Sequence, residues 1–126
     1  MEKLTGTELP SVMALAFLGD AVHSLYIRKR LVAEGISKPG ELNSRALEYV
    51  TAKRQSEALA RIEDMFSEEE ADIYRRARNS PHLRRPKSAA PADYARATGF
   101  EAVLGALFFT GDRDRLEQLL SRSFGD

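Results

Sequence analysis

The chain has 126 residues, 43% of them hydrophobic and 30% charged, and its 19 Lys and Arg residues balance 19 Asp and Glu residues. This length predicts one globular domain, residues 1–126, built around one hydrophobic core. The sequence has no cysteine, which excludes disulfides, thiolate nucleophiles and cysteine-bound metals. We identify no signal peptide and no membrane span, so we expect a cytoplasmic protein that does not contact the membrane.

Helical periodicity extends over nearly the whole sequence and predicts an all-α, compact fold. A first long helix is predicted from Pro10 to Glu34, with the proline in its first turn and Gly35 at its end. Gly19 and Asp20 lie in the middle of this helix, where we expect a bend.

A second helical region follows Pro39 and is predicted either as one helix or as two helices broken near Thr51. Its apolar positions are expected to face the core: Leu42, Ala46, Leu47, Val50, Ala58, Leu59 and Ile62.

The sequence Ser67-Glu68-Glu69-Glu70 has the spacing of a capping box and predicts a helix that begins there and ends near Asn79. Residues 80–91 contain three prolines and are predicted to form the longest loop. Further helices are expected over residues 92–109 and 113–124, with a turn between them.

Basic residues gather around the predicted loop. Between positions 75 and 92 there are six cations and no acid, and the compensating acids lie just upstream. Such segregation either attracts phosphate backbones or is an ordinary solvated helix end. The candidate RNA-binding residues are Arg75, Arg76, Arg78, Arg84, Arg85 and Lys87, with Asn79 as a polar helper.

Two carboxylates occur within apolar segments, Asp20 in the first predicted helix and Glu101 in the helix predicted over residues 92–109. Burying an ionised carboxylate among apolar side chains is costly unless something pairs with it. Two such acids could share one hard cation. His23 lies about one turn after Asp20, and we interpret it as a structural hydrogen-bond donor and not as a metal ligand or base.

The sequence Phe17-Leu18-Gly19-Asp20-Ala21-Val22 resembles the signature of the ribonuclease III catalytic domain, and residues 99–105, GFEAVLG, resemble its second acidic helix. The segments YVTAKRQ (49–55), RRARN (75–79) and ATGFEA (97–102) are similar to the Mini-III branch of that family. The likeness covers nearly the whole chain. Chain length also fits this branch, whose members lack the appended double-stranded-RNA-binding domain, so we expect the catalytic domain itself to bind RNA.

The resemblance implies a homodimeric endoribonuclease that hydrolyses double-stranded RNA in the maturation of large-subunit ribosomal RNA precursors. Asp20 and Glu101 would be its catalytic, metal-binding residues, with Mg²⁺ as the expected cofactor and Mn²⁺ as the alternative. Phe17 matches a position that packs across the dimer interface, and a ribosomal protein is a candidate helper.

This sequence departs from ribonuclease III at two of the four acidic positions of that family's metal site, where it has Ala16 and Thr98. Helical spacing places Ala16 on the face of Asp20 and Thr98 on the face of Glu101. Two other functions therefore stay open: a non-catalytic RNA-binding or ribosome-associated protein on the same fold, and a helical interaction module that uses the acidic residues 68–72.

Overall fold

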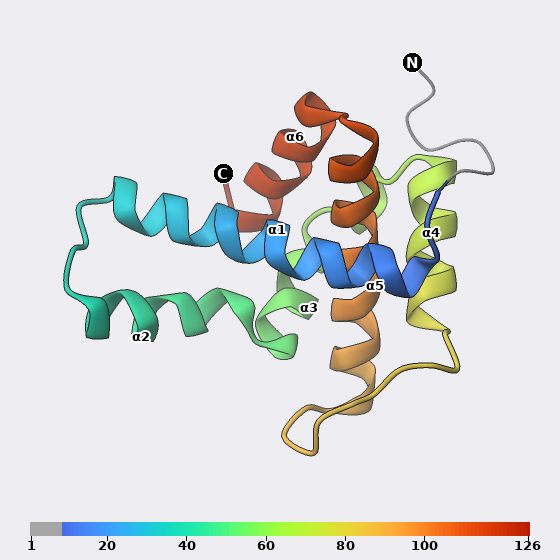
Figure 1. The fold of residues 1–126 in the computed structure, drawn as a ribbon, viewed down its shortest axis with the longest axis horizontal. Helices are drawn as coiled ribbons and strands as arrows, with labels where there is room; N and C mark the ends of the chain where they lie inside the picture. Colours follow the sequence, from blue (N-terminus) through green and yellow to red (C-terminus); the bar gives the residue numbers. More distant parts are fainter. Residues whose placement is uncertain (1–8) are drawn as a thin grey trace.

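The computed structural model describes residues 9–126, which form six α-helices and one short 3₁₀ helix, with no strand in that range (Figure 1). The elements are α1 (Val12–Ala33), α2 (Pro39–Val50), α3 (Ala52–Ala60), η1 (Glu63–Met65), α4 (Glu68–Arg78), α5 (Pro91–Thr110) and α6 (Arg113–Phe124). The all-α fold predicted from the periodicity is confirmed. No helix in the described part of the chain is long and apolar enough to cross a membrane.

Helix α1 crosses α5, and these two helices make the most extensive contact in the fold (Figure 1). Two glycines permit the close approach. A Cβ at Gly19 would overlap the backbone carbonyl of Glu101, and one at Gly105 would overlap that of Leu15. Gly19 therefore lies where two backbones meet, and α1 continues through this position without a break to Ala33.

The N-terminus of α1 differs slightly from the prediction. Ser11 caps the helix by accepting a hydrogen bond from the amide of Ala14, so Pro10 precedes the cap instead of lying in the first turn. At the other end, Gly35 adopts a φ of 94°, a conformation that side chains other than glycine rarely adopt.

The second helical region forms two helices, which is one of the two arrangements predicted from the sequence. Thr51 is extended and caps α3 by accepting a hydrogen bond from the amide of Arg54. Ala58, Leu59 and Ile62 are buried as expected. The prediction is wrong for α2, in which no residue is buried and Leu47 is exposed. Helix α2 packs mainly against α1 in a projecting hairpin (Figure 1), with smaller contacts to α3 and a stacked Tyr49–Phe124 pair to α6, which explains the exposure.

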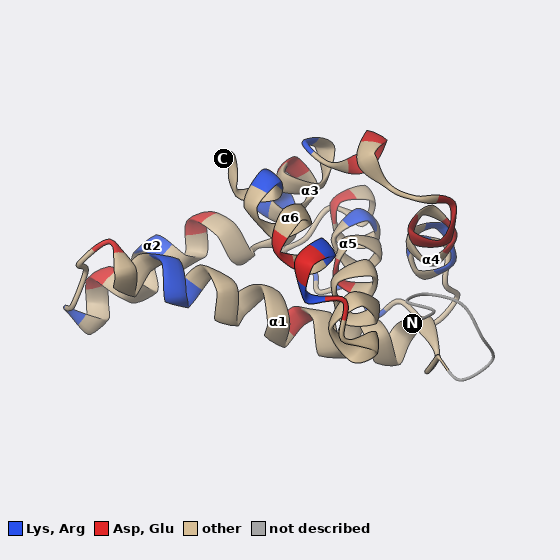
Figure 2. Ribbon diagram, turned by 90° about the horizontal axis from the view of Figure 1, so that it is seen from above, with Lys and Arg blue, Asp and Glu red and all other residues tan. Residues whose placement is uncertain are grey.

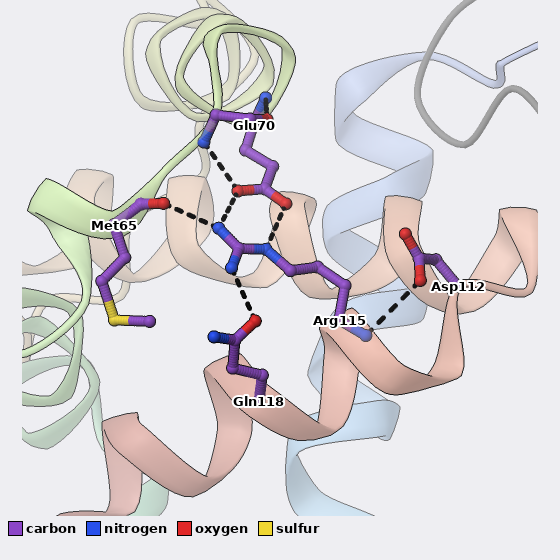
Figure 3. Close-up of polar contacts among 6 residues, drawn as sticks. Met65, Glu70, Asp112, Arg115 and Gln118 are labelled. Carbon is purple, nitrogen blue, oxygen red and sulfur yellow. Dashed lines mark hydrogen bonds and ion pairs between the residues drawn. The ribbon is translucent and has the colours of Figure 1, made fainter.

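The predicted capping box of α4 is present, with Ser67 and Glu70 bonded to each other's backbone amides. Glu70 is buried and also forms a two-pronged ion pair with Arg115 of α6, at 2.8 and 2.9 Å (Figure 3). Burial opposes ionisation of Glu70, but the hydrogen bonds from Arg115 and Ser67 lower its pKa below the ordinary value. Arg115 also donates to the backbone carbonyl of Met65, so this one side chain ties α6 to α4 and η1 (Figure 3).

Candidate active site

Asp20 on α1 and Glu101 on α5 lie beside each other where the two helices cross, although 81 positions separate them in the sequence. Both line a cleft of about 830 Å³. Asp20 is exposed on this cleft, which corrects the expectation that it is surrounded by apolar side chains. Glu101 is half-buried, so the cost of desolvation falls mainly on that carboxylate.

Burial, together with hydrogen bonding to and charge repulsion from the adjacent Asp20 carboxylate, raises the pKa of Glu101 to about 8. A hydrogen bond from Gln55 opposes these effects. Near neutral pH the isolated protein therefore holds a proton on Glu101. A bound cation would replace that proton, because it stabilises both carboxylates in the ionised form.

Gln55 on α3 is a part of the site that the sequence reasoning did not select. Its side-chain amide nitrogen lies 3.2 Å from Glu101 Oε2 and 3.1 Å from His23 Nδ1. Gln55 and His23 are 3% and 2% exposed. Burial lowers the pKa of His23 to about 4, with the Asp20 charge opposing this, so the imidazole is neutral near pH 7. His23 has a structural role, as predicted, but in this bond its Nδ1 accepts from Gln55 instead of donating.

Ala16 and Thr98, which occupy the positions of the two missing acids, also line the cleft. This confirms that they lie on the same helix faces as Asp20 and Glu101. The hydroxyl of Thr98 donates to the backbone carbonyl of Tyr94, 2.9 Å away. Among the residues that line the cleft, all within the described range, Lys53 is the one lysine, arginine or histidine. Sequence reasoning missed Lys53 too, because it lies in the first turn of α3, far from the predicted basic loop.

The donor set of the cleft suits a hard, oxygen-seeking cation. Residues 9–126 contain no group of three or more His, Cys, Asp or Glu side chains arranged to hold a metal. Magnesium is commonly held by one or two carboxylates and keeps several waters. Asp20 and Glu101 fit that requirement, and a cation would favour the ionised form of Glu101, which burial and the neighbouring Asp20 disfavour.

The predicted RNA-binding residues divide into two groups in the structure. Arg75 and Arg76 are exposed on α4, but both form ion pairs with Asp72, at 2.6 and 3.0 Å. Figure 2 shows acidic and basic residues together on α4. The expectation that no acid offsets this part of the cluster is wrong, because Asp72 lies three and four positions before the two arginines, within one helical turn.

The remaining predicted contacts lie at the end of α4 and in the loop that follows it. Arg78 sits over the ring of Tyr74, 5.3 Å from its centroid, and donates to the side chain of Asn79. Residues 79–90 form the loop between α4 and α5, as predicted except that Pro91 begins α5. Four residues of this loop line the cleft, while Arg84, Arg85 and Lys87 are exposed beside them. The loop therefore brings these cations to the edge of the cleft.

Phe17 lines the same cleft and is 84% exposed. It lies one turn before Asp20 on α1. Leu25 and Val32 on the same helix are also exposed, and several exposed apolar side chains on one helix are typical of a contact surface.

Comparison with known proteins decides the family. The Ribonuclease III domain family matches residues 13–112. The chain belongs to this family. It is 46% identical over 113 residues to the Mini-ribonuclease 3 of Thermoanaerobacter sp. (strain X514), covering 90% of this chain and 80% of that one. It is 44% identical over 111 residues to the Mini-ribonuclease 3 of Streptococcus pneumoniae, covering 86% and 87%.

A crystal structure of a Fusobacterium nucleatum protein has the same fold, with a TM-score of 0.80 and 32% identity, covering 90% of this chain and 91% of the other. Together with the family match, this confirms the predicted ribonuclease III-like helical fold and the resemblance to the Mini-III branch. It also confirms the predicted enzyme class: the chain is an endoribonuclease of a family that acts on double-stranded RNA.

Proposed function

We propose that the protein is a homodimeric, divalent-metal-dependent endoribonuclease in which Asp20 and Glu101 form the catalytic centre. The observation that carries this proposal is their meeting in one cleft, from helices far apart in the sequence of a ribonuclease III family member. The proposed substrate is a duplex in the precursor of large-subunit ribosomal RNA, and a ribosomal protein is a candidate helper. The similarity to proteins named Mini-ribonuclease 3 supports this choice.

Asp20 and Glu101 would hold Mg²⁺, with Mn²⁺ as the alternative, through their carboxylate oxygens. When bound, such a cation activates water as the nucleophile and neutralises charge that develops on the phosphate. Asp20 is exposed to the solvent of the cleft and Glu101 is recessed, so the pair presents oxygens at the cleft floor. Lys53 lies on the wall of the same cleft and would attract the RNA phosphate toward these carboxylates.

The RNA surface would extend from the cleft along the loop between α4 and α5. Arg84, Arg85 and Lys87 are exposed there and carry the main phosphate contacts in this proposal. Arg75, Arg76, Arg78 and Asn79 extend the surface onto α4, where the ion pairs with Asp72 weaken the field of the first two. Duplex RNA is recognised mainly through shape, phosphates and 2′-hydroxyls, and a basic rim supplies such contacts.

Phe17 is the proposed dimer contact. Its exposed ring would be covered by a second copy, and a two-fold axis would place one cleft on each strand of a duplex. Phe17→Asp should convert the dimer to a monomer in analytical ultracentrifugation. Leu47→Asp changes another exposed apolar residue, which does not line the cleft, and should leave the dimer intact. A dimer that survives Phe17→Asp would place the interface elsewhere.

The catalytic proposal is tested by cleavage of a long duplex RNA in Mg²⁺, beside single-stranded RNA and an EDTA control. Asp20→Asn and Glu101→Gln should each abolish cutting while RNA binding persists. Asp93→Asn is the matched control, because it removes a different carboxylate from the same cleft. Cutting that persists in either of the first two variants refutes the assignment. If wild-type protein binds duplex RNA without cutting it, a structured ribosomal RNA precursor is the next substrate.

A further inference from the structure

A chain of hydrogen bonds connects the buried interior of the protein to the carboxylate of Glu101. It begins at His23 on α1, passes through the side-chain amide of Gln55 on α3, and ends at Glu101 Oε2 on α5. The two bonds are 3.1 and 3.2 Å long. Three different helices therefore determine the position of one carboxylate oxygen.

The orientation of the Gln55 amide follows from its two partners. Glutamine presents an oxygen on one side of its amide and an NH₂ group on the other, and only the NH₂ group can donate. Neutral His23 offers an unprotonated Nδ1 as an acceptor, and Glu101, which is ionised when a cation is bound, offers Oε2. His23 also lines a second cavity, of about 280 Å³. The NH₂ group of Gln55 satisfies both acceptors at once.

The surroundings restrict any movement of this chain. The ring of His23 packs edge-on against Phe100, with 5.4 Å between centroids and an interplanar angle of 74°. The residue after Gln55, Ser56, accepts a hydrogen bond from Arg96 of α5 at 2.8 Å. Helix α3 is thus fastened to α5 next to Gln55, and His23 is held by the residue that precedes Glu101.

We propose that Gln55 is a positioning residue that holds the Glu101 carboxylate in the orientation for binding the divalent cation, and that His23 fixes the orientation of the Gln55 amide. This inference rests on the proposed function, since it concerns the same metal site. Gln55 and His23 act through Glu101 and touch neither the cation nor the RNA. With Oε2 held by Gln55, the carboxylate cannot rotate freely, and it stays beside Asp20.

The effect should appear mainly as weaker metal binding. Replacing residues that orient metal ligands typically reduces metal affinity about 10- to 100-fold. Gln55→Leu removes the donor at nearly constant volume and should weaken Mn²⁺ binding by this factor. His23→Leu removes the acceptor that orients Gln55 and should weaken it in the same direction. His23→Asn retains a side-chain acceptor close to the position of Nδ1 and should restore most of the affinity.

The experiment measures Mn²⁺ binding to each purified full-length variant by electron paramagnetic resonance, without RNA, and circular dichroism checks that each variant is folded. Gln118→Leu is the matched control, because it makes the same substitution at an exposed position on α6. The Mg²⁺ dependence of cleavage follows as a second readout. Higher Mg²⁺ should restore the rate of Gln55→Leu if its defect is in metal binding, whereas it cannot restore a lost catalytic group.

The outcomes separate this inference from the proposed function. Weak binding by Gln55→Leu and His23→Leu, with near-normal binding by His23→Asn and Gln118→Leu, supports the positioning role. Unchanged affinity in folded Gln55→Leu overturns it while leaving the metal site in place. Equal affinities of His23→Leu and His23→Asn overturn the role of His23, and this comparison remains if Gln55→Leu does not fold. If wild-type protein binds no Mn²⁺, the proposed function and this inference both fail.

Discussion

Replacing Glu101 with glutamine should make the metal-free protein more stable at alkaline pH. The native protein disfavours the ionised form of Glu101, because burial and the neighbouring Asp20 raise its pKa from 4.5 to about 8. Between these two values the native state holds a proton that the unfolded state has released. Stability is therefore lost as pH rises from about 4.5 to about 8. Glutamine does not titrate, so the variant avoids this loss.

The size of the effect follows from the two pKa values. A tenfold change in the acid dissociation constant corresponds to about 1.4 kcal/mol, so ionising Glu101 costs the native state up to about 5 kcal/mol. Water in the cleft and relaxation of the side chains reduce this cost. We therefore expect the free energy of unfolding of the variant, relative to that of wild-type protein, to rise by about 2–5 kcal/mol as the pH increases from 4.5 to 8.5.

Urea unfolding followed by circular dichroism, in EDTA at several pH values, measures this gain. His23 has a pKa lowered to about 4, so its own contribution to stability rises with pH between about 4 and its ordinary value of 6.5. Wild-type protein and Glu101→Gln share this contribution of His23, so it cancels when their free energies of unfolding are subtracted. Mg²⁺ at pH 8.5 should stabilise wild-type protein and leave Glu101→Gln nearly unchanged.

A difference in stability that stays constant from pH 4.5 to pH 8.5 would contradict this reasoning. It would mean that Glu101 titrates near 4.5 in the native protein and that the cleft hydrates both carboxylates well. A gain that grows with pH but persists equally in saturating Mg²⁺ would place the cation at other residues.

Three further tests, each by substitution, concern the fold, the RNA surface and the cleft. Gly19→Ala should destabilise the protein by about 3 kcal/mol or more in urea unfolding, because its Cβ overlaps the Glu101 carbonyl, whereas Gly40→Ala meets open space and should be neutral or slightly stabilising. Arg84→Ala and Arg85→Ala should each reduce by about one the slope of log affinity for duplex RNA against log salt concentration, and unchanged slopes would move the RNA surface elsewhere. Lys53→Met should slow cleavage without altering Mn²⁺ affinity, and weaker Mn²⁺ binding would contradict its role toward phosphate.

Most of the fold could be predicted because its helix boundaries have local causes. The capping box at Ser67 begins α4, and the final helix begins and ends at the predicted residues, Arg113 and Phe124. Gly111 ends α5 with a φ of 79°. Such signals depend on neighbouring residues only. The burial of α2 could not be predicted in this way, because Leu47 has a helical apolar spacing but faces solvent on the projecting hairpin.

The two candidate catalytic acids could be selected from the sequence because each is a carboxylate within an apolar motif. Gln55 carries no comparable signal. An uncharged residue in a short amphipathic helix is ordinary, and its importance depends on the meeting of α1, α3 and α5 in space. The pairing of Arg75 and Arg76 with Asp72 could have been predicted from the sequence, because residues three or four positions apart on a helix are neighbours.

Having two carboxylates instead of four has one advantage and one disadvantage for this site. Additional acids at Ala16 and Thr98 would line the same cleft and repel Glu101, which already binds a proton until about pH 8 in the metal-free protein. Their absence limits that repulsion, but it leaves fewer oxygens to direct a cation. Accurate placement of the two remaining carboxylates then matters more. The buried hydrogen bonds of His23 and Gln55 supply that placement with neutral groups, so they add no charge to a cleft that must also accept an RNA phosphate.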